Sequence, residues 1–378
     1  MRPKIILSVL VLSAGISVLP RSSSGKDFSP GEHWKRPAEA GAQKAGLPAH
    51  PEKCGECHKR QYDGWKGSLH SRAAGPGLLA QLNPLKKPSD ALTCYFCHAP
   101  LAEQSEVTSK GKKNAGFDAR LRDAGVACAS CHLREGKIFG PPVGAHPLVE
   151  QGKSKGHGKS VKAGFFQKSE FCAACHQLDE GYSLNGKLLV NTYNEWKGSS
   201  FAEEGVQCQD CHMPDKEHLW RGVHDPEMTG RALDIKTVRT KTGAKLVITN
   251  AGAGHYFPTY ATPLVVVTGF VKDVAGAETG KKEGFIGRKV SLDLEREEFD
   301  TRLAPGKSFE FEYAAEKPPP GAKIVFEVRV FPDMFYNGFF KLAATEGVKG
   351  INRGLASKAM AKTESSPYLL WRGEIPAE

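Results

Sequence analysis

The sequence predicts two parts of different fold class: a mostly α and irregular region at residues 51–230, and a β-sandwich-like region at residues 231–378. Three observations support this division. All ten cysteines lie in the first part, in five copies of one short motif. Helical periodicity between the motifs is weak. From about residue 231, stretches rich in β-branched residues follow one another between Gly/Pro turns, as in a sandwich of short strands.

The five motifs are C-x-x-C-H sequences, and they use every cysteine of the chain. Their residues are Cys54, Cys57 and His58; Cys94, Cys97 and His98; Cys128, Cys131 and His132; Cys172, Cys175 and His176; and Cys208, Cys211 and His212. C-x-x-C-H is the attachment sequence of haem c: two thiols form thioethers to the porphyrin, and the histidine binds the iron. The motifs therefore predict five covalently bound haem c groups, with iron, as cofactors.

Other uses of cysteine fit this pattern less well. Disulfide pairing gives no reason for a histidine after every second cysteine. A structural zinc site combines two C-x-x-C units, which would leave one of the five units without a partner. A thioredoxin-like site needs a single C-x-x-C in an α/β setting.

The N-terminus has the layout of an export signal. Arg2 and Lys4 precede a mostly apolar run from Ile5 to Leu19, and small polar residues follow up to Gly25. The run of ~15 residues is shorter than a membrane span. We expect a signal peptide at 1–25, a polar lead-in at 26–50, and a periplasmic or extracellular protein, although an uncleaved anchor is an alternative.

The positive charge of the sequence does not indicate nucleic-acid binding. The formal net charge is +10, and the expected signal peptide carries three of the basic residues. Two propionates on each of five haems would bring the mature protein to roughly +2 when oxidised and −3 when reduced. Lysines near the haems would instead stabilise propionates or steer an acidic redox partner.

The C-x-x-C-H region is too compact to give each haem its own domain, so the porphyrins are expected to pack against one another and form much of the core.

A near-repeat lies inside this region. Tyr62-Asp-Gly-Trp-Lys-Gly-Ser68 resembles Tyr193-Asn-Glu-Trp-Lys-Gly-Ser199, and the position of His70 after the first copy is held by Phe201 after the second. We expect the tryptophan of each copy to pack on a porphyrin and His70 to bind iron.

Eight histidines lie outside the motifs: His33, His50, His70, His146, His157, His218, His224 and His255. They suffice for a second axial ligand on every iron, although an open position on one haem remains possible in principle and would allow substrate binding. His70 ranks high because it follows a Trp-bearing helix. His255 follows Asn250-Ala-Gly-Ala-Gly254, where small residues allow the backbone to approach a flat cofactor. Met213 and Met228 are weaker candidates.

Several stretches after residue 231 have the composition of strands. Three are rich in β-branched residues, and two alternate apolar and polar residues; they are Lys245–Thr249, Pro263–Val271, Lys323–Phe331, Lys289–Leu294 and Ser308–Tyr313. We expect these to be strands, Pro318–Gly321 to be a loop, and Ile351–Lys362 to be a short helix.

Five segments together resemble the multihaem cytochrome c superfamily, which includes the tetrahaem carrier of ammonia oxidisers, hydroxylamine oxidoreductase and pentahaem nitrite reductase. They are Trp65–His70, Cys172–Gln177, Glu195–Ser199, Cys208–Pro214 and Gly254–Thr259. The resemblance implies a multihaem cytochrome c domain packed around five haems with mostly bis-histidine iron, and an appended β-domain. It implies the distal ligands His70, His146, His218, His224 and His255.

The sequence departs from the enzymes of that superfamily. Pentahaem nitrite reductase attaches its catalytic haem through C-x-x-C-K, whereas all five motifs here end in histidine. No tyrosine here can be matched to the cross-linked one of hydroxylamine oxidoreductase. We therefore expect an electron carrier rather than an enzyme, with no catalytic residue assigned.

Two other functions are kept as alternatives. One is an oxidoreductase acting on a small nitrogen or sulfur oxyanion at one open haem, which the missing histidine at Phe201 motivates. The other is a subunit of an extracellular cytochrome filament or membrane electron conduit. The expected partners are redox proteins, such as a membrane quinol-oxidising complex or other multihaem cytochromes, and a homo-oligomer is a further possibility.

Overall fold

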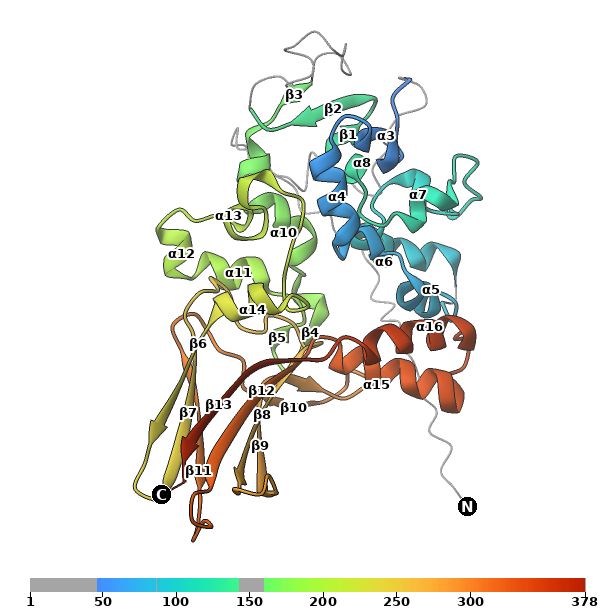
Figure 1. Ribbon diagram of the computed structural model, residues 1–378. Coiled ribbons are helices and arrows are strands. Elements are labelled where there is room, and N and C mark those ends of the chain that lie inside the picture. Colours follow the sequence, from blue (N-terminus) through green and yellow to red (C-terminus); the bar gives the residue numbers. More distant parts are fainter. Residues whose placement is uncertain (1–45, 86, 143–159, 378) are drawn as a thin grey trace.

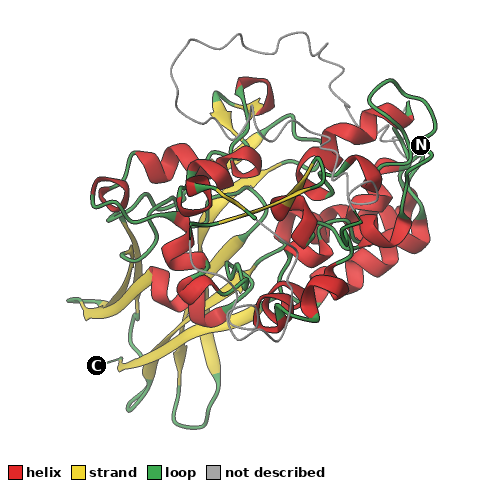
Figure 2. Cartoon of the chain, turned by 90° about the horizontal axis from the view of Figure 1, so that it is seen from above, coloured by secondary structure: helices red, strands yellow, loops and turns green. Residues whose placement is uncertain are grey.

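The computed structural model describes residues 46–85, 87–142 and 160–377. Its N-terminal part consists of short helices joined by long irregular segments, and its C-terminal part contains most of the strands (Figure 1). Seen from above, the strands extend from one side of the helical part (Figure 2). The expected signal peptide and most of the polar lead-in lie outside the described residues.

The helices of the N-terminal part are short. They are α3 (Pro51–Gly55), α4 (Lys59–Gly67), η1 (His70–Arg72), α5 (Pro76–Leu82), η2 (Pro88–Asp90), α6 (Ala91–His98), η3 (Ala102–Gln104), α7 (Ala119–Asp123), α8 (Cys128–His132), η4 (Gly164–Gln167), α10 (Glu170–His176), η5 (Glu180–Tyr182), α11 (Thr192–Lys197), α12 (Ser200–Glu203), α13 (Cys208–His212), η6 (Pro214–Lys216) and α14 (Pro226–Ala232). Proline fixes the first turn of α3, α5 and α14, where its missing N–H costs nothing.

Two small sheets lie within this part. β1 (Leu133–Arg134), β2 (Lys137–Gly140) and β3 (Val161–Lys162) form one sheet, in which β2 pairs with β1 antiparallel and with β3 in parallel. β4 (Ser183–Leu184) and β5 (Lys187–Leu188) form a hairpin. The side chain of Arg134 is buried beneath the first sheet and donates to the carbonyl oxygens of Ala129 and Ser130, which ties β1 to α8.

The C-terminal part contains two antiparallel sheets. The larger has the strand order β10-β9-β8-β12-β13, and the smaller has the order β11-β7-β6. Their bounds are β6 (Leu233–Arg239), β7 (Gly243–Asn250), β8 (Leu264–Lys272), β9 (Glu278–Val290), β10 (Glu297–Asp300), β11 (Ser308–Ala314), β12 (Lys323–Phe331) and β13 (Tyr368–Pro376). Side chains of both sheets share one hydrophobic cluster, in which the rings of Phe311 and Tyr313 meet Phe326 edge-on. Burial of this apolar surface holds the sheets together.

A pair of helices joins the two parts. α15 (Met334–Leu342), which η7 (Ala343–Gly347) continues, packs against α16 (Arg353–Glu364), and both lie beside α5 of the N-terminal part (Figure 1). Ala80 of α5 is fully buried in the same cluster as Phe339 and Phe340. The Asn352 side chain caps α16 by accepting from the Leu355 amide. The C-terminal part is therefore anchored on the region that carries the C-x-x-C-H motifs.

The strand predictions are largely confirmed, with two corrections. The stretch Lys289–Leu294 is only partly a strand, because β9 ends at Val290 and a turn follows. Helix α15 was not predicted, because its sequence is as rich in aromatic residues as a buried strand.

Candidate functional site

The five C-x-x-C-H motifs all lie on short helices. In α6, α8, α10 and α13, the motif histidine is the last residue of the helix, and in α3 the helix ends inside the motif. All ten cysteines lie within the described residues and none forms a disulfide. Each motif therefore presents two thiols and one imidazole from a single helix end, which is the geometry that covalent attachment of a haem requires.

Three motif histidines each face a histidine from elsewhere in the chain. The ring centroids lie 6.2 Å apart for His70 and His176, 6.1 Å for His132 and His218, and 6.3 Å for His212 and His255. Two imidazoles on opposite sides of one metal ion, each with its nitrogen about 2 Å away, have centroids roughly 6.2 Å apart. Each pair thus leaves room for one iron between its rings, and the residues fit bis-histidine haems.

Most of these histidines are held by a hydrogen bond at Nδ1. Four of them, and also His98 of the second motif, donate to backbone carbonyl oxygens: His98 to Ala73 (2.8 Å), His132 to Phe139 (2.9 Å), His212 to Arg221 (2.7 Å), His218 to Lys216 (3.0 Å) and His255 to Tyr256 (2.9 Å). Such a bond places the ring proton on Nδ1 and orients the ring, which leaves Nε2 to bind a metal.

Burial favours the neutral form of five of the six facing imidazoles. It lowers the pKa of His70 to about 3 and the pKa of His176 to about 4, in both cases with a smaller contribution from neighbouring histidines. The pKa values of His212, His218 and His255 are lowered mainly by the same burial. Because only a neutral imidazole can donate its lone pair to iron, these rings are ready to ligate at ordinary pH.

Trp220 touches two of the facing histidines. Its ring lies edge-on to His70 at a centroid distance of 4.6 Å and to His218 at 5.0 Å. Trp220 has a positive φ of 41°, a conformation that is costly for a residue with a side chain and persists only where its surroundings fix it. The Nδ1 of His70 is buried and has no hydrogen-bond partner within the described residues, so packing on Trp220 is what orients its ring.

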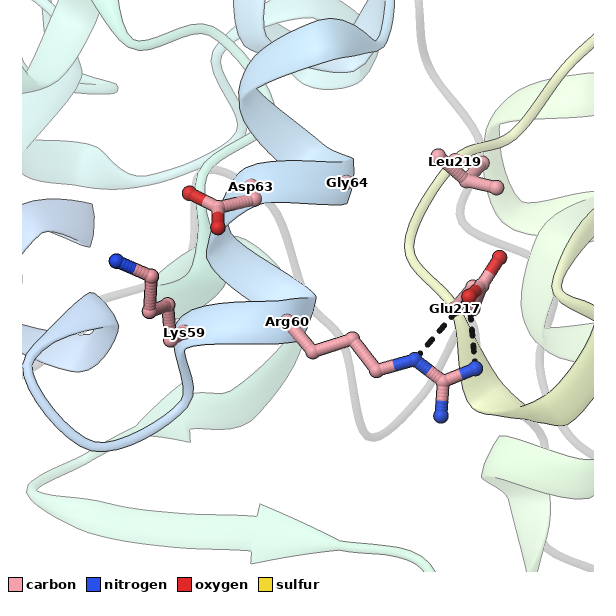
Figure 3. Close-up of a pocket in the computed structure, with 6 residues that line it drawn as sticks. All are labelled: Lys59, Arg60, Asp63, Gly64, Glu217 and Leu219. Carbon is pink, nitrogen blue, oxygen red and sulfur yellow. Dashed lines mark hydrogen bonds and ion pairs between the residues drawn. The ribbon is translucent and has the colours of Figure 1, made fainter.

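The segment that carries His218 is held against α4 (Figure 3). Arg60 donates from Nε and Nη2 to one oxygen of Glu217, at 3.1 and 2.7 Å. A Cβ on Gly64 would lie 3.2 Å from the backbone of His218, so only glycine allows this approach without displacement. The pocket that these residues line, of about 630 Å³, also contains Lys59, Asp63 and Leu219.

Side-chain contacts between motif cysteines show which motifs are neighbours. Cys54 hydrogen-bonds Cys128, which joins the first motif to the third, and Cys172 hydrogen-bonds Cys208, which joins the fourth to the fifth. Burial raises the pKa of the Cys131 thiol to about 11, and the charge of Cys175 makes a smaller contribution in the same direction. The first, third, fourth and fifth motifs therefore follow one another in space.

The two copies of the sequence repeat make the same contacts. Trp65 donates from Nε1 to the carbonyl oxygen of Val126 at 2.8 Å, and Trp196 does the same to Val206 at 2.9 Å. Each valine lies two residues before a motif. The repeat therefore holds the start of the third and fifth motifs in equivalent ways.

Phe201, which replaces a histidine in the second copy, packs against the segment before His255. A Cβ on Gly254 would lie 3.0 Å from the Cβ of Phe201, and one on Gly252 would collide with the carbonyl oxygen of Arg231. The small residues before His255 therefore allow this backbone to pack closely against Phe201 and Arg231 of the same chain. His255, which faces His212, comes from the C-terminal part and lies directly after this contact.

The other predicted distal ligands have different surroundings. His224 bonds through Nε2 to a carboxylate oxygen of Asp333 at 3.0 Å. His50, which is not among the predicted distal ligands, bonds in the same way to Asp118 at 2.8 Å. His146, like His33 and His157, lies outside the described residues. Within the described residues, no second histidine ring lies opposite His98 at the spacing of the three pairs.

Polar groups gather near the second motif. Burial raises the pKa of Tyr336, with contributions from the charges of Cys94 and Asp333, and raises the pKa of Tyr182 with contributions from Asp179, Cys94 and Cys97. Asp333 is also the partner of His224. Two phenols thus lie near Cys94, and one of them, Tyr336, also lies near the His224–Asp333 pair.

One motif histidine is bonded to a side chain instead of the backbone. The Nδ1 of His176 lies 2.6 Å from the hydroxyl of Tyr260, which is 84 residues away in the chain. Neither Tyr260 nor Trp220 could be singled out from its neighbours in the sequence, because aromatic residues are usually packing residues. The nearby Gly254–Thr259 segment was the signal that could have led to Tyr260.

The comparisons with known proteins agree with this geometry. Residues 53–133 match the family model "Cytochrome c554 and c-prime". Cytochrome c-554 of Nitrosomonas europaea is 28% identical over 149 residues, which is 36% of this chain and 60% of that protein. The multiheme cytochrome MtrA of Shewanella baltica is 23% identical over 138 residues, which is 34% of this chain and 38% of that protein. The alignments thus span less than two thirds of these relatives.

A solved structure resembles most of the chain. It is a penta-heme cytochrome c552 from Thermochromatium tepidum, with a TM-score of 0.60 and 21% identity, covering 86% of this chain and 98% of that one. Its similarity shows a shared fold that includes helical and β-rich parts. No helix among the described residues has the length and apolar character needed to cross a membrane.

Proposed function

Because this chain is a multihaem c-type cytochrome, we propose that it carries electrons through five haems between redox partners outside the cytoplasm. The observation that carries the proposal is the set of three facing histidine pairs. An iron with two imidazole ligands changes its bond lengths little when it gains an electron, which favours rapid transfer, and it has no position open to substrate.

The chain's own residues would hold each haem in a defined way. The ten motif cysteines provide the thioethers, and His58, His98, His132, His176 and His212 provide the proximal ligands. His70, His218 and His255 are proposed as the distal ligands of the fourth, third and fifth haems, and His146 and His224 remain the predicted ligands for the other two. Bound haem supplies one reversible electron per iron.

The contacts between motifs suggest a route for electrons. The contact of Cys54 with Cys128 and that of Cys172 with Cys208 support two closely packed haem pairs. The interaction of Cys131 with Cys175 supports an approach between the pairs. The proposed order along the route is therefore first, third, fourth and fifth haem, and the second haem lies beside it.

The C-terminal part has two proposed roles. We infer that its two sheets form a β-sandwich that packs on the haem region and supplies His255 as a ligand. The proposed location, in the periplasm or outside the cell, follows from the chemistry of haem c attachment and from the expected signal peptide at 1–25. Proposed partners are other multihaem cytochromes or a membrane quinol-oxidising complex.

Electron paramagnetic resonance of the oxidised holoprotein tests the carrier function. The proposal predicts low-spin ferric signals from the haems of His132, His176 and His212. High-spin signals from three or more haems per chain would contradict it, because at most two low-spin haems would remain and the three facing pairs could not all be ligand pairs.

A second function is favoured by the surroundings of the second motif. Within the described residues, His98 has no histidine opposite it, whereas Tyr182 and Tyr336 lie near Cys94. Asp333, the partner of His224, also lies near Tyr336. A haem with one open position and proton-donating groups nearby would suit reduction of a small nitrogen or sulfur oxyanion. A high-spin signal worth one haem, which hydroxylamine or nitrite perturbs, would support this function. Wholly low-spin spectra would show instead that His224 or another residue closes the position.

A further inference from the structure

His176 differs from the other ligand candidates in the partner of its Nδ1. The five carbonyl acceptors described above belong to the backbone, whereas the acceptor at His176 is the Tyr260 hydroxyl at 2.6 Å. Tyr260 comes from the irregular segment between β7 and β8, the segment that also carries His255, so the C-terminal part contacts the rings of two motif histidines, His176 and His212. Tyr260 and Val190 also form an isolated β-bridge, which fixes the backbone at this point.

The hydroxyl of Tyr260 is the first member of a chain of hydrogen bonds. It bonds Thr192, whose Oγ1 lies 2.9 Å from the Oγ1 of Thr259. Thr259 in turn donates to Glu195 Oε2 at 2.5 Å, the short distance of a bond from a hydroxyl to a carboxylate. The Tyr260 hydroxyl accepts from His176 Nδ1 and still has one proton of its own, which it can donate to Thr192.

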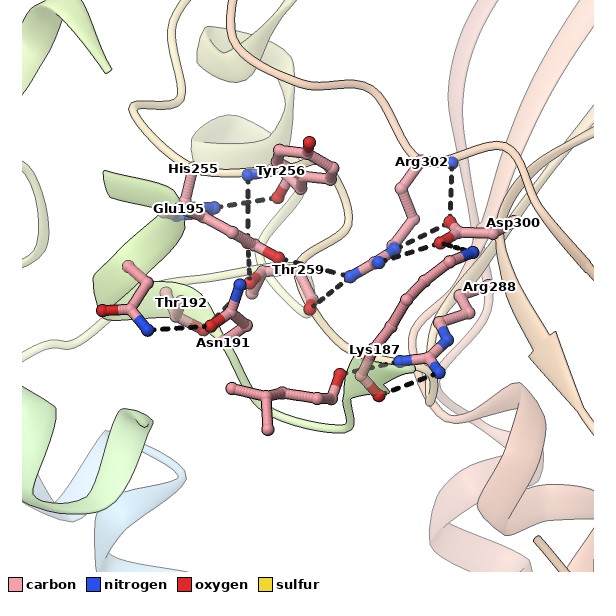
Figure 4. A network of polar contacts seen from close by, with 12 residues as sticks. Lys187, Asn191, Thr192, Glu195, His255, Tyr256, Thr259, Arg288, Asp300 and Arg302 are labelled. Atoms are coloured by element: carbon pink, nitrogen blue, oxygen red, sulfur yellow. Dashed lines mark hydrogen bonds and ion pairs between the residues drawn. The ribbon is translucent and has the colours of Figure 1, made fainter. Parts of the chain in front are cut away.

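The series of hydrogen bonds ends at Glu195, whose carboxylate is buried. Its side chain is 4% exposed and lies near Arg302, whose Nη1 is 3.3 Å from Glu195 Oε1 (Figure 4). The backbone amide of Tyr256 also donates to Glu195 at 3.2 Å. Arg302 is shared with Asp300, to which it donates from Nε and Nη2 at 2.8 and 2.9 Å. The charge at the end of the chain is therefore fixed in place and shielded from water.

The direction of these bonds decides their effect on His176. Each hydroxyl accepts one bond and donates the next toward Glu195, so the bonds polarise one another in the same sense. The result is a stronger acceptor at Tyr260 and more negative character on the His176 imidazole. An axial histidine with more basic character stabilises ferric over ferrous iron.

We propose that Tyr260, supported by Thr192, Thr259 and Glu195, is a positioning residue that lowers the reduction potential of the haem ligated by His176. This inference rests on the proposed ligation of that haem by His176 and His70. In the proposed route this haem lies between the third and the fifth, so the C-terminal part would set the potential at the centre of the path.

The test is a spectroelectrochemical titration of the holoprotein. With Tyr260→Phe, one fifth of the haem absorbance should titrate at a more positive potential, and the other four fifths should be unchanged. Thr192→Val keeps the Tyr260 hydroxyl but interrupts the chain, so it should shift the same component in the same direction by a smaller amount. The matched control is Tyr313→Phe, which removes a hydroxyl that donates to the carbonyl oxygen of Gly280 within the β-rich part.

The outcomes separate this inference from the proposed function. Potentials that stay unchanged, or a shift to more negative values, in a fully loaded, low-spin Tyr260→Phe protein would overturn it. If Tyr260→Phe does not load haem, an unchanged titration of Thr192→Val overturns it instead. The spectroscopic component that His70→Ala removes should be low-spin in the wild-type protein. If that component is not low-spin, the ligation by His70 and His176 is refuted, and with it the proposed function of this pair.

Discussion

The rings of His212 and His255 lie nearly parallel, with planes 11° apart and centroids 6.3 Å apart. His212 ends the helix of the fifth motif, and His255 belongs to the segment that follows β7 in the C-terminal part. The pair therefore links the two parts of the molecule through the iron that it would share. A haem at this position would hold the C-terminal part in place as well as conduct electrons.

Removing His255 should open one haem. In His255→Ala, the iron bound by His212 loses its second imidazole, so one low-spin haem should become high-spin, and added imidazole should restore it. Electron paramagnetic resonance of the oxidised protein measures the change. His50→Ala is the control, because His50 bonds Asp118 and faces no motif histidine. An unchanged low-spin spectrum in His255→Ala would show that another residue ligates this iron.

Replacing Trp220 should disturb two haems together. Trp220→Leu removes the edge contacts to His70 and His218, so the orientations of both rings, and the low-spin signals of their two haems, should change. The loss of a large, partly buried ring should also lower the free energy of unfolding, by about 1–3 kcal/mol. Trp371→Leu, at the edge of the β-rich part, is the matched control. A change in a single haem signal would mean that Trp220 orients only one ligand.

Two glycines of α4 should respond in opposite ways to alanine. A Cβ at Gly64 would meet the backbone of His218 at 3.2 Å, whereas nothing lies within 4 Å of one at Gly67. Gly64→Ala should therefore destabilise the holoprotein by about 1–3 kcal/mol through overpacking and alter the low-spin signal of the His132 haem. Gly67→Ala should be neutral or stabilising by up to about 1 kcal/mol, because alanine favours the helix. Thermal unfolding compares them, and equal effects would contradict the proposed packing.

The ion pairs that Asp300 forms with Arg302 and Lys187 should make the free energy of unfolding depend on pH. Burial alone would raise the pKa of Asp300, but hydrogen bonds from Arg302 and Lys187 hold that pKa well below its usual range. A carboxyl with a depressed pKa contributes stability above its unfolded pKa of about 3.9, and loses it as pH falls toward the folded pKa. The stability that the Asp300 carboxylate contributes between β5 and β10 should therefore decline as the pH falls below about 4.

Asp300→Asn isolates this contribution. The variant should be less stable than the wild type at pH 7, by about 1–3 kcal/mol for the lost charge-assisted bonds, and the difference should shrink as the pH falls below 4. Thermal unfolding between pH 7 and pH 3 measures it, with Glu310→Gln as an exposed control whose partner is Lys245. A difference that stays constant with pH would show that the Asp300 charge is not the cause.

Much of the fold could be predicted because its determinants are local. The C-x-x-C-H motifs and the stretches that became β7, β8, β11 and β12 are read from consecutive residues. Helix α15 could not be read in this way. Its residues Phe339 and Phe340 would suit a strand equally well, and their helical state depends on packing against α16 and α5, which are distant in the sequence.

The candidate site, like the fold, could be predicted only where its determinants are local in the sequence. The proximal histidines follow from their motifs, and ranking His70, His218 and His255 as ligand candidates was possible from their neighbours in the sequence. Which candidate faces which motif depends on tertiary structure. The same is true of the contact between Tyr260 and His176, because hydrogen bonds between distant segments leave no periodic signal.

The central claim is that five haems are covalently attached and share the core. The most direct test is the intact mass of the mature protein, made in a host that attaches haem c and measured under denaturing conditions. The account predicts the mass of the polypeptide plus five haem groups, and loss of one group for each motif whose cysteines are both replaced by alanine. A protein with the mass of the bare polypeptide, or with fewer than five groups at full maturation, would contradict it.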